Sequence, residues 1–186
     1  MRIISGKFKG RVLASFQADH VRPTMDRVKE TLFNKWMHHV EGARVLDLFS
    51  GTGSLGLEAL SRGAIHIHFV EKNLKSIQII KKNIELLKID RAEFNISQKD
   101  VLTYLEKYSS GAPFNLILID PPFTEKLAHA VMEALDKSFC FDDQTLIAIE
   151  SLKQERIDSE YQHLFRYDFK DYGDKILSFY RKKEQS

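Results

Sequence analysis

The sequence predicts a doubly wound α/β fold, built on a mostly parallel sheet that ends in an antiparallel hairpin. From about residue 44 to residue 150, short apolar segments alternate with segments whose apolar residues recur at helical spacing. Residues 114–119 are an almost unbroken apolar run, which is typical of a central strand covered on both faces. Two strand-like segments, 164–169 and 175–180, close the chain around a turn at 171–174.

The first 43 residues are predicted to form an extension in front of this core. Short extended segments at 2–4 and 11–13, broken by glycines, predict a small β-hairpin. A helix is expected to follow, with Thr24 as its cap. Its apolar face consists of residues spaced three to four apart: Met25, Val28, Leu32, Trp36 and Val40.

The core from residue 44 to residue 186 then reads as one domain together with this extension. Its predicted strands are 44–49, 66–71, 92–97, 114–119, 144–150, 164–169 and 175–180. Its predicted helices are 54–62, a segment capped by Asn73, 101–108 and 124–137, with a weak helix after residue 150. The alternation predicts a seven-stranded sheet with helices on both faces.

Composition limits the classes of protein to consider. A length of 186 residues fits one domain, and the sequence contains no apolar run of about 18 residues and no apolar leader, so we expect no membrane span. Cys140 is the single cysteine, which excludes an internal disulfide and fits a reducing cytoplasm. No set of His, Cys and acidic residues has metal-ligand spacing, so we expect no metal.

Charge is unevenly distributed along the chain. Residues 1–44 contain nine Lys or Arg against four Asp or Glu, a net charge of +5, whereas the whole chain is +2, so the remainder is −3. A basic front on a nearly neutral body suggests contact with a polyanion. A merely solubilising basic surface is the alternative that charge alone leaves open.

A glycine loop follows the first core strand. Gly51 and Gly53 allow a sharp turn and close approach of a ligand to the backbone, and Gly56 would let the next helix lie against the sheet. Glu71 ends the following strand, where its carboxylate can bind ribose hydroxyls. The spacing serves both dinucleotides and S-adenosylmethionine, but a carboxylate within the strand, Asp47, favours the cationic amino-acid tail of the latter.

A second motif, Asp120-Pro121-Pro122-Phe123, follows the most apolar strand. The two prolines fix the backbone and remove two amide donors, so the turn presents acceptors, the Asp120 carboxylate and the Pro121 carbonyl. Two acceptors match the two N–H donors of a nucleobase amino group, and Phe123 could stack on the base. We therefore interpret the turn as a site for methyl transfer to a base nitrogen, with Asp120 as acceptor or base.

The residues that carry these motifs resemble the RsmD family of bacterial 16S rRNA guanine-N2 methyltransferases, which have a Rossmann-like class I fold. The resemblance covers nearly the whole chain, and its most discriminating part is Arg22-Pro23-Thr24-Met25-Asp26-Arg27. Matching segments also include 2–11, 47–64, 71–72, 120–123 and 172–174. Ser5 and Ser50 stand where glycine and alanine are frequent in the family.

The resemblance implies S-adenosylmethionine as methyl donor, S-adenosylhomocysteine as product and a guanine of 16S rRNA as acceptor, alone or within the small subunit. The implied cofactor-binding residues are Thr24, Asp47, Ser50, Gly51, Gly53, Gly56, Glu71, Lys72, Asp100 and Val101. The implied RNA-binding residues are Lys7, Lys9, Arg11, Arg22 and Arg27. Asp100 has two open interpretations, a contact with the adenine amino group or an ordinary helix cap.

Several alternatives share part of this pattern. A DNA adenine or cytosine amino-methyltransferase would share both motifs, although this chain has no room for a separate target-recognition domain. An NAD-dependent oxidoreductase would have no use for Asp-Pro-Pro-Phe. A non-catalytic ribosome-assembly factor would not need Asp120. A monomer is the expected state.

Overall fold

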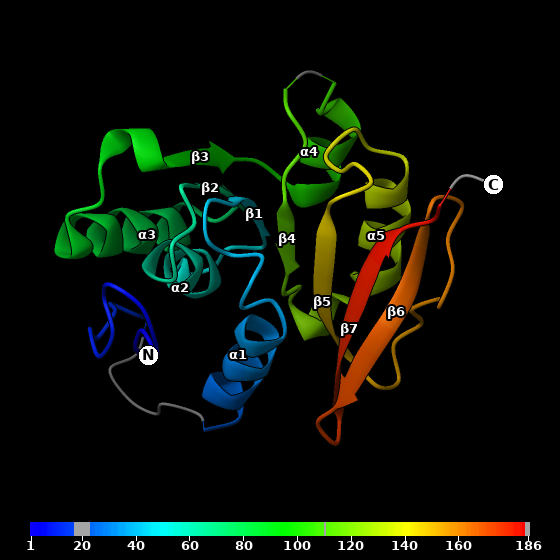
Figure 1. The fold of residues 1–186 in the computed structure, drawn as a ribbon, viewed down its shortest axis with the longest axis horizontal. Helices are drawn as coiled ribbons and strands as arrows, with labels where there is room; N and C mark the ends of the chain where they lie inside the picture. Colours follow the sequence, from blue (N-terminus) through cyan, green and yellow to red (C-terminus); the bar gives the residue numbers. More distant parts are fainter. Residues whose placement is uncertain (17–22, 110, 185–186) are drawn as a thin grey trace.

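The computed structural model describes residues 1–16, 23–109 and 111–184 of the 186-residue chain. Its elements follow one another as α1 (Pro23–Lys35), β1 (Arg44–Leu48), α2 (Ser54–Ser61), β2 (His66–Glu71), α3 (Leu74–Leu87), η1 (Arg91–Glu93), β3 (Phe94–Gln98), α4 (Val101–Lys107), β4 (Leu116–Ile119), η2 (Phe123–Glu125), α5 (Ala128–Asp136), β5 (Leu146–Leu152), β6 (Leu164–Asp171) and β7 (Lys175–Lys182). Figure 1 shows this course from the N-terminal extension to the closing hairpin.

The described strands form one seven-stranded sheet with the order β3-β2-β1-β4-β5-β7-β6. The first five strands are parallel, and β7 is antiparallel to both of its neighbours, β5 and β6. The structure thus confirms the predicted Rossmann-like fold with its antiparallel closing hairpin, and it places the last strand, β7, between β5 and β6. Parallel strands need crossover helices, which place helical layers on the sheet.

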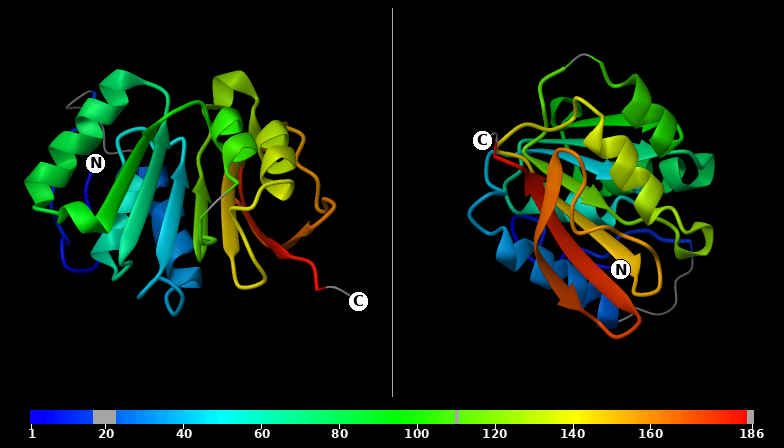
Figure 2. Two further views of the ribbon diagram at one scale, coloured as in Figure 1. Left: turned by 90° about the horizontal axis from the view of Figure 1, so that it is seen from above. Right: turned by 90° about the vertical axis from the view of Figure 1, so that its right-hand side faces the viewer.

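Helices cover both faces of the sheet. One core cluster joins residues of α1, α2 and α3 to one face, and the other joins residues of α4 and α5 to the opposite face. The right-hand view of Figure 2 shows α1 and α5 on opposite sides of the strands. Strand β4 is buried at all four of its positions, as the apolar run at 114–119 predicted. No helix among the described residues is long and apolar enough to cross a membrane.

The predicted pairing of segments 2–4 and 11–13 is present as a short antiparallel bridge at Arg2 and Val12, with the Ile3 amide donating to the Arg11 carbonyl and the Leu13 amide to the Met1 carbonyl, both at 2.9 Å. The structure corrects three other details of the predicted elements. Helix α1 ends at Lys35, although Trp36 and Val40 beyond it are buried. The predicted helix 124–137 is a 3₁₀ turn followed by α5. No helix follows residue 150 before β6 in the described chain, because β5 continues to Leu152 and an irregular segment then leads to β6.

The third strand starts two residues later than predicted because a capped turn precedes it. Asp90 accepts a hydrogen bond from the Ala92 amide, and Glu93 closes a capping box on the Asp90 amide. This reciprocal capping favours a 3₁₀ turn over further extended backbone. The predicted cap of α1, Thr24, has a side chain that lies outside the described part of the chain, as does all of Arg22.

Candidate active site

The site lies where the strand order reverses. The chain runs from β1 outward to β2 and β3, and then returns to place β4 on the other side of β1. Asp47 pairs with Leu118 across β1 and β4, and Leu48 pairs with Ile119, so both strands end at the same edge. In open α/β sheets, ligands bind at such a reversal beyond the carboxyl ends of the strands. Both motifs singled out in the sequence leave the sheet at this point.

The loop after β1 is held in an unusual backbone conformation. Gly51 and Gly53 have φ angles of 55° and 81°, and Phe49, which is not a glycine, has a φ of 60°. The Gly51 amide donates to a Glu71 carboxylate oxygen at 2.8 Å, and the other oxygen accepts from the Asn73 amide at 2.8 Å. The Ser50 hydroxyl donates to the Asp47 carbonyl at 2.7 Å and accepts from the Val70 amide. The loop is therefore fastened to β2 before any ligand arrives.

Asp47 and Gly56 are joined across the loop. The Gly56 amide donates to the Asp47 carboxylate at 3.0 Å. A Cβ on Gly56 would lie 2.6 Å from Phe69, so only glycine lets α2 approach β2 this closely, as the sequence predicted. Burial raises the pKa of Asp47 to about 8, with smaller contributions from the charges of Asp120 and Glu71. A buried carboxylate of this kind favours a cationic ligand that would stabilise its ionised form.

Two cavities, of about 270 and 350 Å³, meet at the loop and share Phe49, Gly51 and Asp120 as lining residues. Asp47 and Ser50 line the first cavity, and Glu71, Lys72 and Val101 line the second. Each cavity is near the lower limit for a drug-sized ligand, so an extended nucleoside would need both. The structure thus brings most of the predicted cofactor-binding residues to one continuous site.

Three predicted cofactor residues, Asp100, Lys72 and Gly53, already have contacts within the protein. The Asp100 carboxylate caps α4 by accepting from the amides of Leu102 and Thr103 at 3.0 and 3.2 Å, which is the ordinary capping arrangement that the sequence left open. The Lys72 ammonium is paired with Glu125 at 3.2 Å. Gly53 is the N-cap residue of α2 and packs near Ile80 and Phe69.

The acidic turn places Asp120 in both cavities. Pro122 has a φ of −64° and leads directly into η2, which begins with Phe123. Burial and the neighbouring charge of Glu150 raise the pKa of Asp120 to about 7, whereas Lys175 opposes this shift. A carboxylate with a pKa raised by burial and by a neighbouring acid is common at functional sites.

Sequence reasoning missed Glu150 and Lys175, which lie beside this turn. The Lys175 ammonium is 2.6 Å from a Glu150 carboxylate oxygen and 4.0 Å from the centre of the Phe123 ring. Glu150 lines the same cavity as Asp120. One signal was available for Glu150, since it is an acid that directly follows an apolar run, just as Asp120 does. The sequence held no comparable signal for Lys175.

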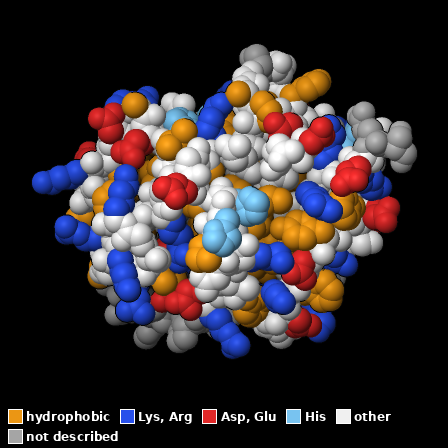
Figure 3. All heavy atoms as spheres, in the orientation of Figure 1, with side chains coloured by type: hydrophobic (Ala, Val, Ile, Leu, Met, Phe, Trp, Pro, Cys, Tyr) orange, Lys and Arg blue, Asp and Glu red, His pale blue; other side chains and the backbone are white. Residues whose placement is uncertain are grey.

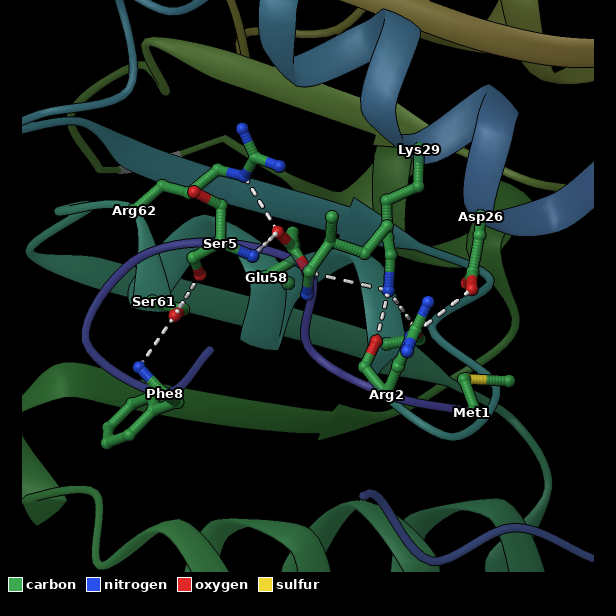
Figure 4. A network of polar contacts seen from close by, with 12 residues as sticks. Met1, Arg2, Ser5, Phe8, Asp26, Lys29, Glu58, Ser61 and Arg62 are labelled. Atoms are coloured by element: carbon green, nitrogen blue, oxygen red, sulfur yellow. Dashed lines mark hydrogen bonds and ion pairs between the residues drawn. The ribbon is translucent and has the colours of Figure 1, made fainter. Parts of the chain in front are cut away.

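A buried network ties the N-terminal extension to α2 (Figure 4). The Glu58 carboxylate is fully buried and accepts from the amides of Ile4 and Ser5 at 2.8 and 3.0 Å. It also pairs with Arg62 at 2.7 Å and with Lys29 at 3.4 Å. Burial lowers the pKa of Lys29, and the charge of Glu58 opposes that effect. Lys29 lines the first cavity and was not predicted as a site residue.

The predicted RNA-binding residues lie on the surface. Lys9, Arg11 and Arg27 are exposed, and Lys7 is paired with Glu93 at 2.9 Å. The turn that carries Lys7 lies close to the end of α2, where the Lys7 amide donates to the Ser61 carbonyl at 2.7 Å. The approach requires glycine at position 6, since a Cβ there would lie only 1.7 Å from the same oxygen. In Figure 3, Lys and Arg side chains gather on the left of the molecule, the side that carries α3 and the N-terminal segment in Figure 1. Among the described residues, no group of three or more His, Cys, Asp or Glu could hold a metal ion.

Known proteins share this arrangement over nearly the whole chain. Residues 1–181 match the family model described as Conserved hypothetical protein 95. Ribosomal RNA small subunit methyltransferase D of Haemophilus influenzae is 36% identical over 153 residues, which cover 82% of this chain and 79% of that protein. YlbH of Bacillus subtilis is 33% identical over 185 residues, 98% of this chain and 100% of YlbH.

Solved structures agree with the sequence relatives. The yhhF protein of Escherichia coli superposes with a TM-score of 0.85 and 31% identity, covering 100% of this chain and 99% of that chain. SMU.776, a chain solved in complex with SAH, has a TM-score of 0.66 at 17% identity and covers 82% of this chain and 49% of its own, a likeness of fold alone. By sequence and by fold, the chain belongs to the RsmD family of methyltransferases.

Proposed function

We propose that this protein, acting as a monomer, transfers a methyl group from S-adenosylmethionine to the exocyclic N2 of one guanine in small-subunit rRNA. The observation that carries the proposal is the position of Asp120. Its carboxylate lines both cavities, beside the glycine loop and on the same edge of the sheet as Asp47. A methyl donor held by the loop and an amino group held by Asp120 would therefore meet.

The residues present fit S-adenosylmethionine. A Cβ on Gly51 would meet nothing nearer than 3.9 Å, so the backbone there is open to a ligand. Asp47 is a buried carboxylate suited to the ammonium of the methionine part, and Glu71 is a strand-end acid suited to ribose hydroxyls. When bound, S-adenosylmethionine supplies a methyl group activated by the positive sulfonium. SMU.776, which shares this fold, was solved with SAH.

The acidic turn supplies what a base amino group requires. The lone pair of an exocyclic amine is delocalised into the ring, so the amine is a weak nucleophile. The Asp120 carboxylate and the Pro121 carbonyl are acceptors that would orient its two N–H groups and leave the nitrogen lone pair free to react. Asp120 would also accept the proton that the amine loses, a role suited to a carboxylate with a pKa of about 7.

The choice of RNA rests on the relatives and on charge. Two relatives, from Haemophilus influenzae and Escherichia coli, are named for methylation of small-subunit rRNA. Lys9, Arg11 and Arg27 are exposed and available for phosphate contacts. The target base would have to leave its stack, because Asp120 is half-buried within the site.

The decisive experiment maps N2-methylguanosine by mass spectrometry in rRNA from cells that lack the protein. Complementation uses the wild type, Asp120→Asn, and Asp143→Asn as a matched control, since Asp143 is an exposed carboxylate paired with Lys182. We expect loss of the modification at one small-subunit guanine, restored by the wild type and the control but not by Asp120→Asn. An unchanged map would refute the rRNA substrate, and a parallel assay on duplex DNA would then test the alternative acceptor.

A further inference from the structure

Three charged side chains project from the same face of three adjacent strands. Strands β4, β5 and β7 are neighbours in the sheet, and Ile119 of β4 pairs with Ile149 of β5. Asp120 and Glu150, one residue further along each strand, therefore lie side by side and face the same way. Glu150 pairs with Leu177, so Lys175, two residues before Leu177, also lies on that face.

The contacts order these groups as cation, carboxylate, carboxylate. The Lys175 ammonium is 2.6 Å from a Glu150 carboxylate oxygen. The side chains of Lys175 and Glu150 are only 22% and 14% exposed. Glu150 and Asp120 line one cavity, and the pKa of Asp120 is raised by burial and then by the Glu150 charge. Two carboxylates held together away from water are unfavourable unless donors satisfy them.

A guanine carries a matching row of groups on its Watson–Crick edge. In order, this edge presents the O6 acceptor, the N1–H donor and the N2 amino donor. Adenine and cytosine each present a ring nitrogen with a lone pair where guanine presents N1–H. A carboxylate beside Asp120 would attract the guanine N1–H and repel the lone pair of either other base, which is discrimination by an unfavourable contact.

We propose that Lys175, Glu150 and Asp120 together read the Watson–Crick edge of the target guanine, with Lys175 donating to O6, Glu150 accepting from N1–H and Asp120 accepting from the N2 amino group. The inference rests on the proposed function and deepens it. Glu150 and Lys175 are the residues that determine base specificity, while Asp120 contacts the reacting nitrogen. The ion pair between Lys175 and Glu150 holds both groups in register before the base arrives.

The test uses 2-aminopurine, which keeps the 2-amino group of guanine but lacks both O6 and N1–H. Once the methylated position is mapped, small-subunit RNA carrying guanosine or 2-aminopurine there is assayed, free or reassembled with ribosomal proteins. The measured quantity is the ratio of kcat/KM for guanosine to that for 2-aminopurine. We expect a ratio of about 100 or more for the wild type, because sites built to hydrogen-bond a substrate group strongly reject analogues that lack it.

Two variants should lower the ratio of kcat/KM for guanosine to kcat/KM for 2-aminopurine. Glu150→Gln can turn an amide donor toward the ring nitrogen of 2-aminopurine, and Lys175→Met removes a contact that only guanosine makes. We expect each to lower the ratio by about tenfold, the value of one good hydrogen bond to a charged group. Glu160→Gln and Lys183→Met are matched controls, because they alter another Glu–Lys pair whose carboxylate is 72% exposed, and they should leave the ratio unchanged.

The ratio separates specificity from folding, since both substrates meet the same enzyme preparation. If Glu150→Gln and Lys175→Met lower activity on both substrates equally, the pair supports only the architecture of the turn and the proposal is wrong. If the wild type methylates guanosine and the ratios of the variants fall, the proposal stands. A wild type that methylates no guanine in small-subunit RNA would overturn the proposed function itself, before any variant is compared.

Discussion

Replacing Glu58 by glutamine should destabilise the protein more than any surface change. Glu58 is fully buried and Lys29 is 4% exposed, so water screens neither charge. The carboxylate accepts from Ile4, Ser5 and Arg62 and pairs with Lys29 (Figure 4). Glutamine keeps the size of the side chain but removes its charge. Three donors then lose a charged acceptor, and the buried Lys29 cation loses its partner.

The magnitude follows from the uncompensated cation. Breaking a buried ion pair by removing one partner costs about 3–5 kcal/mol. Lys29 keeps the Arg2 carbonyl at 2.8 Å and the Ser54 hydroxyl at 3.3 Å, which favours the lower end of that range. For a domain of this size, each kcal/mol lowers Tm by about 2–4 °C, so a fall of about 6–12 °C is expected. Lys29→Met should cost less, because Glu58 keeps Arg62 and two amide donors.

The assay combines thermal unfolding with limited trypsin digestion. Glu85→Gln, at an exposed position of α3, is the control and should melt with the wild type. Loss of the Glu58 contacts should also free the N-terminal segment, whose tryptic sites are Arg2, Lys7, Lys9 and Arg11. Cleavage there should be faster in Glu58→Gln at a temperature where the domain is folded. A Tm within about 2 °C of the wild type, or an unchanged cleavage rate, would refute the reasoning.

Three further predictions concern the active site and its surface. Gly56→Ala would place a Cβ 2.6 Å from Phe69, so we expect a loss of about 1–3 kcal/mol in urea unfolding and weaker binding of S-adenosylhomocysteine by calorimetry. The pKa of Asp120 is raised to about 7, and in the proposed reaction its ionised form is the acceptor. We therefore expect kcat/KM to rise with pH through about 7 and to level off above it, whereas a flat profile from pH 6 to 8 would exclude this role. Lys9→Gln and Arg11→Gln should each weaken RNA binding and reduce the salt slope by about 1, which filter binding at several salt concentrations would measure.

The sheet could be predicted because its signals are local. Apolar runs, helical periodicity and glycine stops each act within a few residues, and the expected strands all appear close to their predicted places. The errors fell where non-local contacts decide the structure. Residues 1–3 and 11–13 pair as predicted, with the Ile3 amide bonded to the Arg11 carbonyl, but the pairing stops there because the Ile4 and Ser5 amides bond to Glu58 of α2. A pairing pattern of this kind cannot be read from local sequence.

The candidate site also contains residues that local sequence predicts and residues that depend on non-local contacts. Gly51, Glu71 and Asp120 could be predicted because each follows a recognisable strand, and the topology brings strand ends together. The pair of Glu150 and Lys175 needed the antiparallel insertion of β7 between β5 and β6, which places Lys175 beside Glu150. The sequence indicated the hairpin but not its register. A one-residue shift in register would have turned Lys175 to the opposite face of the sheet.

Helix α2 connects the two regions that the proposed reaction requires, the loop assigned to the cofactor and the basic N-terminal segment assigned to RNA. Its N-cap, Gly53, belongs to the loop that we assign to the cofactor, and its Glu58 and Ser61 hold the N-terminal segment that carries the basic residues. The helix is only eight residues long, and six of them are buried. Because a short buried helix moves as one body, the basic N-terminal segment and the glycine loop are held at a fixed separation. A variant that loosens the Glu58 network should therefore raise KM for RNA even where cofactor affinity is unchanged.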